Sequence, residues 1–124
     1  MKIGTKYTSQ TVVTENLTAR SVGSGDMAVF ATPAMAALME NAAMNAVAPL
    51  LNETQTTVGS EISTTHLRPT PVGATISATA TLTAVEGRKL SFDIVAEDAH
   101  GVIGEGKHTR FIVDRERFLS KIAQ

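Results

Sequence analysis

The sequence predicts an α+β domain in which an antiparallel β-sheet curls around one long central helix. Residues 31–49 consist almost entirely of apolar, helix-forming residues. Residues 74–85 and 90–96 alternate between apolar and polar side chains with the period of a β-strand. The chain shows no βαβ repetition, which disfavours a parallel sheet. Its 124 residues are expected to form one domain, residues 1–124.

The predicted helix over residues 31–49 is apolar on nearly every face. Its polar interruptions are Glu40, Asn41 and Asn45. Thr32 is placed to cap the amino end, Pro33 suits the first turn, and Pro49 marks the other end. A helix of roughly 16 residues with a carboxylate in the middle is too short and too polar to cross a membrane. We therefore expect the rest of the protein to enclose it.

The segment before this helix predicts a strand and then a loop. Residues 5–18 alternate loosely, which is typical of a half-buried strand. Residues 19–27 are rich in serine and glycine and show no periodicity, so they predict a flexible loop that borders a pocket.

The segment after the helix predicts a run of antiparallel strands and a short terminal helix. The expected strands are residues 57–67, 74–85, 90–96 and 102–113. A hairpin turn is expected around Gly87. Gly104 and Gly106 lie on one face of the last strand, where they permit close approach of the helix or a ligand. Asp114 is placed to cap a final helix.

Composition excludes several classes of function. The chain has 11 Lys plus Arg and 12 Asp plus Glu, a formal net charge of −1, so it lacks the basic surface that nucleic acids require. It has no cysteine, which excludes disulfides and thiolate chemistry. Because no apolar run follows Met1, we expect no secretory signal, no membrane association and a cytoplasmic location.

Three polar residues in apolar surroundings are candidates for chemistry. Thr32, Glu40 and His66 supply a hydroxyl, a carboxylate and an imidazole, the groups that activate a nucleophile or water for acyl transfer. Each also has a structural interpretation. Thr32 can serve as a helix cap, Glu40 as one partner of a buried polar pair, and His66 as a hydrogen-bonded core histidine facing the helix.

The sequence predicts neither a metal site nor a bound nucleotide cofactor. The three histidines, His66, His100 and His108, are widely separated and form no ligand pair at helix or strand spacing. The glycines of residues 101–106 precede no helix, so they form no phosphate-binding loop.

The chain resembles the hotdog-fold thioesterases of the fluoroacetyl-CoA thioesterase branch, over roughly residues 5–118. The matching segments are residues 29–32, 38–40, 48–50, 58–59, 64–66, 70–71 and 85–88. The resemblance implies a hotdog fold, a homodimer or higher homo-oligomer with active sites at the subunit interface, and an acyl-CoA substrate. It implies no cofactor other than the coenzyme A of the substrate.

The resemblance also implies residue roles. Thr32, Glu40 and His66 match the family's catalytic residues, and Gly59 matches a glycine whose N–H faces the thioester carbonyl. Basic residues near turns and sheet edges are candidates for the CoA phosphates. These are Arg88, Lys89 and Arg110. The expected activity is hydrolysis of a small or medium acyl-CoA. The alternative is a non-catalytic hotdog protein that binds acyl-CoA or another small ligand.

Two features leave parts of this prediction open. Residues 20–29 contain no aromatic residue, whereas the fluoroacetate-specific enzyme has aromatics over its acyl pocket, so the acyl group is not assigned. Eight helical residues place Thr32 and Glu40 about 12 Å apart along the axis. Either Thr32 lies on a loop folded back over the first turn, or the groups meet across a dimer interface, or Glu40 acts through substrate or water.

Overall fold

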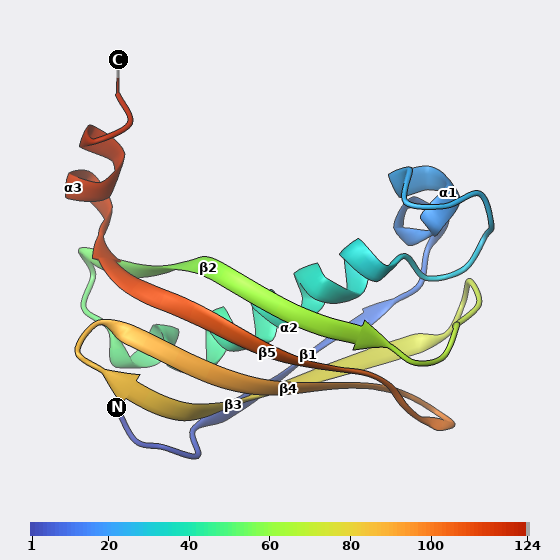
Figure 1. Cartoon of the computed structure of the whole chain (residues 1–124), viewed down its shortest axis with the longest axis horizontal. Helices are drawn as coiled ribbons and strands as arrows, with labels where there is room; N and C mark the ends of the chain where they lie inside the picture. Colours follow the sequence, from blue (N-terminus) through green and yellow to red (C-terminus); the bar gives the residue numbers. More distant parts are fainter. Residues whose placement is uncertain (124) are drawn as a thin grey trace.

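The computed structural model describes residues 1–123 and shows a five-stranded antiparallel sheet curled around one long helix (Figure 1). The elements in chain order are β1 (Lys6–Val12), η1 (Glu15–Leu17), α1 (Ala19–Val22), α2 (Thr32–Val47), η2 (Ala48–Leu50), β2 (Gln55–His66), β3 (Thr75–Glu86), β4 (Lys89–Asp98), β5 (Gly101–Asp114) and α3 (Arg115–Ser120). The predicted α+β architecture is confirmed.

The core lies between α2 and the concave face of the sheet. One side of α2 is fully or almost fully buried, through Met35, Met39, Ala42, Ala43, Ala46 and Val47. The strands contribute alternate residues to the core, as predicted. These are Ile76, Ala78, Ala80 and Leu82 of β3, and Leu90, Phe92, Ile94 and Ala96 of β4. The many alanines bring helix and sheet close together.

The opposite side of α2 is exposed in the single chain, so the expectation that the protein encloses the helix on every side is wrong for one protomer. Pro33, Ala37, Asn41 and Met44 face outward. The sheet covers only the side of the helix that carries Met35 and Met39, because a five-stranded sheet curls around one face and not the other.

No helix within residues 1–123 is long and apolar enough to cross a membrane.

The strand order is β1-β3-β4-β5-β2, and every neighbouring pair is antiparallel. Within the described residues β2 pairs only with β5, so it forms one edge of the sheet. Its pairing shifts by one residue between Gly59 and Glu61, a β-bulge. The close approach predicted at Gly104 is confirmed, because a Cβ there would lie 2.6 Å from Met35 Sδ.

The local predictions differ from the structure in three places. The strand expected over residues 5–18 ends at Val12, and the loop expected over residues 19–27 begins with the short helix α1, which Thr18 caps. The predicted N-cap role of Thr32 is wrong. The N-cap of α2 is Ala31, Thr32 is already the first residue of the helix, and no side chain caps this end. The hairpin at Gly87 and the Asp114 cap of α3 are confirmed.

Candidate active site

A hydrogen bond joins Thr32 to His66 where the amino end of α2 meets the carboxyl end of β2. Thr32 Oγ1 lies 2.8 Å from His66 Nδ1. Phe30 holds the imidazole from the side, with the two rings edge-to-face at 82° and 6.3 Å between centroids. The Thr32 hydroxyl is free for this contact because it caps no helix. The structure thus brings together two of the three predicted catalytic residues.

Partial burial favours the neutral form of the His66 imidazole. Desolvation lowers the pKa of His66 below its ordinary value of 6.5, and a backbone hydrogen bond with Arg68 acts in the opposite direction. The Nε2 atom is buried without a hydrogen-bond partner. A neutral imidazole with one nitrogen next to a hydroxyl can accept that hydroxyl's proton, so the pair has the geometry of a nucleophile and its base.

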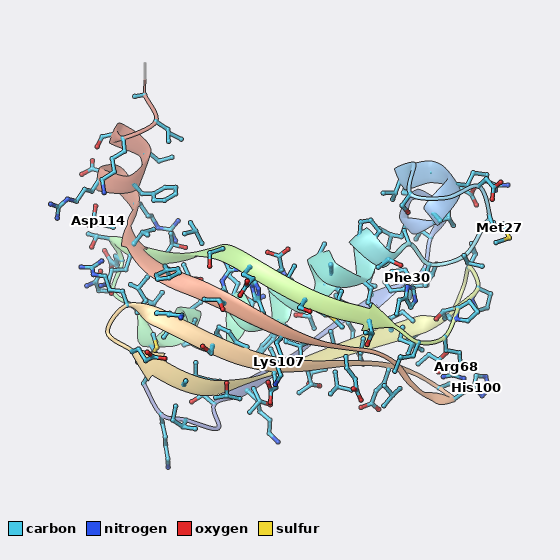
Figure 2. All side chains as sticks on the ribbon, in the orientation of Figure 1. Met27, Phe30, Arg68, His100, Lys107 and Asp114 are labelled. Carbon is cyan, nitrogen blue, oxygen red and sulfur yellow. The ribbon has the colours of Figure 1, made fainter. Side chains whose placement is uncertain are left out.

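A hollow of about 290 Å³ opens beside the Thr32–His66 pair. Its walls come from α1 and the loop after it, from the start of α2, and from the segment after β2. The lining residues are Ala19, Ser24, Val29, Phe30, Thr32, His66, Leu67, Arg68 and Pro69. Figure 2 shows Phe30, Met27 and Arg68 together at this end of the molecule. The predicted pocket next to residues 19–27 is therefore present.

Glu40 lies elsewhere, in the middle of α2 and next to β2. Its Oε2 atom lies 3.9 Å from Arg110 Nη1 and 3.9 Å from His108 Nε2, and its side chain is 41% exposed. Gly59 borders the same carboxylate, because a Cβ on Gly59 would lie 2.8 Å from Glu40 Oε2. Of the predicted site residues, Glu40, Gly59 and Arg110 thus form a second group.

Arg110 is held in the interior of the protein. It was grouped with Arg88 and Lys89 as an exposed basic residue near a turn or sheet edge, and this is wrong, since only 6% of it is exposed. Its guanidinium donates to the hydroxyl and carbonyl oxygens of Thr57 and to His108 Nε2. Burial lowers the pKa of Arg110, and the charge of Glu40 acts in the opposite direction. The guanidinium therefore faces the partly exposed Glu40 carboxylate and is shielded from solvent.

His108 is a site-bordering residue that sequence reasoning did not find. Its Nδ1 lies 2.7 Å from the Glu61 carbonyl oxygen, which can only accept, so Nδ1 carries the proton and Nε2 accepts from Arg110. Burial lowers the pKa of His108. The signal was available in β5, where His108 and Arg110 continue the inward-facing series of Gly104 and Gly106.

The two groups are separated by the regular geometry of α2. Thr32 lies at its first residue and Glu40 eight residues later, about 12 Å along the axis. Because Thr32 is itself helical, the alternative of a loop folded back over the first turn is wrong. Contact through a second protomer, or through substrate or water, remains. Arg88 and Lys89 lie exposed at the β3–β4 turn and contact neither Thr32 nor Glu40, although Lys89 pairs with Phe111 of β5, next to Arg110.

Comparison with known proteins places this geometry in a family. The model of the fluoroacetyl-CoA-specific thioesterase family matches residues 13–116. The chain belongs to this family. The fluoroacetyl-CoA thioesterase of Streptantibioticus cattleyicolor is 38% identical over 130 residues, with 100% of this chain and 94% of that protein covered. The predicted family, hotdog fold and enzyme class, a thioester hydrolase, are confirmed.

Solved structures agree with this assignment. A Thr-to-Ser variant of the fluoroacetyl-CoA enzyme in complex with acetyl-CoA is 36% identical, with a TM-score of 0.93 over 98% of this chain and 96% of that chain. A thioesterase superfamily member from Thermus thermophilus is 26% identical, with a TM-score of 0.90 over 97% and 89% of the two chains. A hot-dog-like protein from Thermanaerovibrio acidaminovorans, at 22% identity, a TM-score of 0.85 and coverage of 98% and 93%, shares the fold.

Proposed function

We propose that this thioesterase hydrolyses a small or medium acyl-CoA in the cytoplasm, as a homodimer and with no cofactor beyond the CoA of its substrate. The observation that carries the proposal is the 2.8 Å contact between Thr32 and a partly buried His66 at the edge of a hollow. The hollow offers room for the acyl group, and Phe30 is the only aromatic residue besides His66 in its described lining, since residues 20–29 contain none. We therefore do not restrict the acyl group to fluoroacetyl.

In the proposed reaction, the Thr32 hydroxyl or a water held beside it attacks the thioester carbonyl carbon. His66 Nδ1 takes the proton of the attacking group as the new carbon–oxygen bond forms. The carbon–sulfur bond then breaks, and the imidazolium returns the proton to the departing thiolate. If Thr32 attacks, water hydrolyses the acyl-threonine in a second round of the same proton transfers.

Glu40 and Gly59 complete this site from the second protomer in our proposal. Glu40 orients the attacking group, and the Gly59 N–H stabilises the oxyanion. Two features favour the dimer. Strand β2 leaves a 12-residue edge unpaired within the described chain, which is ready to add a second β2. The exposed side of α2 also carries the apolar residues Pro33, Ala37 and Met44.

The CoA phosphates lie outside the acyl site, and we propose Arg88 and Lys89 as contributors to their binding. Both side chains are exposed at the β3–β4 turn. Arg110 is better suited to hold Glu40, because its guanidinium is already bound to Thr57 and faces the carboxylate.

Hydrolysis of a panel of acyl-CoAs tests the proposal. We expect thioester cleavage by the wild type and its near-complete loss in His66→Ala and Glu40→Ala. Lys107→Ala, an exposed residue on the other face of the sheet, serves as control and should leave the rate unchanged. Absence of cleavage over the panel, together with stabilisation by acyl-CoA in a thermal-shift assay, would favour the non-catalytic binding protein instead. Variants as active as the wild type would refute the residue roles.

A further inference from the structure

An ion pair holds the segment that follows β2 against the β4–β5 turn. Arg68 Nη2 donates to Asp98 Oδ1 at 2.6 Å and to the Gly101 carbonyl oxygen at 3.3 Å. The Asp98 side chain is only 7% exposed, and its Oδ1 also accepts the His100 N–H at 2.7 Å. Figure 2 shows Arg68 and His100 at the same end of the molecule. A charged hydrogen bond to a buried, doubly bonded carboxylate fixes the arginine more firmly than an exposed pair would.

Backbone hydrogen bonds anchor the same segment. The Arg68 N–H donates to the Ile103 carbonyl oxygen at 3.3 Å. Two residues later, the Thr70 carbonyl oxygen accepts the Phe30 N–H at 2.9 Å. The Phe30 ring in turn packs edge-to-face against the His66 ring. The residues that directly follow His66 are therefore fixed with respect to its imidazole.

One nitrogen of His66 has no partner in the proposed reaction. Nδ1 faces the Thr32 hydroxyl, so Nε2 carries the proton of the neutral ring, and it is buried without a hydrogen bond. When Nδ1 takes the proton of the attacking group, Nε2–H becomes part of a cation. A buried cation needs an acceptor, and the described lining of the hollow contains no carboxylate.

The backbone of Arg68 offers that acceptor, because it raises the pKa of His66. A backbone group favours the charged imidazole only through its carbonyl oxygen, since a backbone N–H would disfavour the positive charge. The Thr32 hydroxyl occupies Nδ1, which leaves Nε2 as the nitrogen that this oxygen serves. The carbonyl group and the guanidinium belong to one residue, so the bond to Asp98 also restricts where the carbonyl oxygen lies.

We propose that Arg68 and Asp98 are positioning residues for His66. Their ion pair holds the Arg68 carbonyl oxygen where it accepts a hydrogen bond from Nε2–H as the imidazole becomes charged. A base whose second nitrogen is held by an acceptor keeps its tautomer and orientation. The inference rests on the proposed role of His66 as the base. It extends the site to a carboxylate on the β4–β5 turn, which acts through Arg68.

NMR titration of the His66 ring tests this placement without an activity assay, with the His66 signals identified by their loss in His66→Ala. Arg68→Met removes the guanidinium, and we expect the pKa of His66 to fall. Loss of a positive charge alone would raise that pKa, so a fall identifies displacement of the carbonyl oxygen. Arg68→Lys keeps the charge pair and should lie closer to the wild type. An unchanged or raised pKa in Arg68→Met overturns the proposal.

A double variant keeps the test independent of any single substitution. Arg68→Met with Asp98→Asn removes both charges of the pair, so the local net charge is unchanged. The pKa of His66 should fall in this variant as well, provided that circular dichroism shows a folded chain. A wild-type value in the folded double variant also overturns the proposal.

Kinetics with acyl-CoA give the second readout. In Asp98→Asn we expect kcat to fall about tenfold or more with little change in KM, and the acidic limb of kcat/KM to move to lower pH. The double variant should be no slower than the slower single variant, because both substitutions break the same pair. A fall in kcat with an unmoved acidic limb would show a merely structural role and overturn the proposal.

The matched control is the ion pair of Lys107 and Asp93, which joins Nζ to Oδ1 at 2.8 Å on side chains that are 80% and 55% exposed. Lys107→Met and Asp93→Asn should change neither kcat nor the pKa of His66. The failures of the two proposals are distinguishable. A wild type that cleaves no thioester contradicts the proposed function, whereas an active wild type with an unaltered His66 titration in the Arg68 variant overturns the positioning role alone.

Discussion

Pairing two inactive variants is expected to restore activity if each active site takes residues from both protomers. The variants are His66→Ala, which removes the base beside Thr32, and Glu40→Gln, which removes the carboxylate beside Gly59. Thr32 and Glu40 lie about 12 Å apart on one regular helix. The two substitutions therefore affect different halves of the proposed site.

The size of the recovery follows from the twofold symmetry. In a His66→Ala/Glu40→Gln heterodimer, one site contains both substitutions and the other contains neither. One of two sites then works, so the purified heterodimer should have about half the wild-type activity per dimer. If equal amounts of the two chains pair at random, about half the dimers are heterodimers, and the mixture should reach about a quarter of wild-type activity.

Co-expression with two affinity tags gives the heterodimer directly, and thioester hydrolysis is then measured at saturating acyl-CoA. The matched control pairs Thr32→Ala with His66→Ala. Both residues lie in the same half-site, so each site of that heterodimer retains one substitution and no recovery is expected. If the His66→Ala/Glu40→Gln heterodimer is no more active than the mean of its two parents, the shared site is refuted.

Four further outcomes are expected. Gly59→Ala places a Cβ 2.8 Å from Glu40 Oε2, so kcat/KM should fall at least about tenfold while circular dichroism stays unchanged. Because burial lowers the pKa of His66, the acidic limb of a pH profile of kcat/KM should have its midpoint below 6.5. Burial also lowers the pKa of His108, so just below pH 6.5 the unfolded chain binds more protons than the folded chain. The free energy of unfolding, measured with urea, should therefore fall as the pH decreases below 6.5. Gly104→Ala places a Cβ 2.8 Å from the Thr65 carbonyl oxygen and should cost about 1–3 kcal/mol in urea unfolding, whereas Gly106→Ala, with contacts of 3.1 Å or more, should cost less. A stability of Gly104→Ala equal to that of Gly106→Ala would contradict the packing argument.

The parts of the fold that follow local rules could be predicted from the sequence. The alternation of β3 and β4 is a local pattern, and its buried positions are those that the period predicted. The start of α2 depends on distant residues instead. The Phe30 N–H donates to the Thr70 carbonyl oxygen, and the Ala31 N–H donates to that of Leu17. These bonds hold the chain extended through Ala31, so Thr32 enters the helix and turns to His66.

The site was predictable where a local pattern sets the direction of a side chain, and less so where its surroundings come from other elements. His66 was expected to face the helix because alternation along β2 places it on the inner face. Arg110 was grouped with the exposed basic residues near turns and sheet edges, which are usually solvated. Its inward position on β5 is tolerated because Thr57 and His108 bind the guanidinium and Glu40 faces it. Those partners come from other strands and from α2, which no local pattern shows.

The helix itself explains why the site has two halves. An α-helix cannot bring its first residue and its ninth together, so Thr32 and Glu40 form separate groups, each with its own supporting residues. Thr32 has the partly buried His66, and Glu40 has Arg110 beside Gly59, where a Cβ would lie 2.8 Å from the carboxylate. Neither half contains a complete set of attacking group, base and carboxylate. A twofold axis at the β2 edge would supply each half with the other. One interface would then complete both acyl sites, and loss of the dimer should abolish hydrolysis without unfolding the sheet.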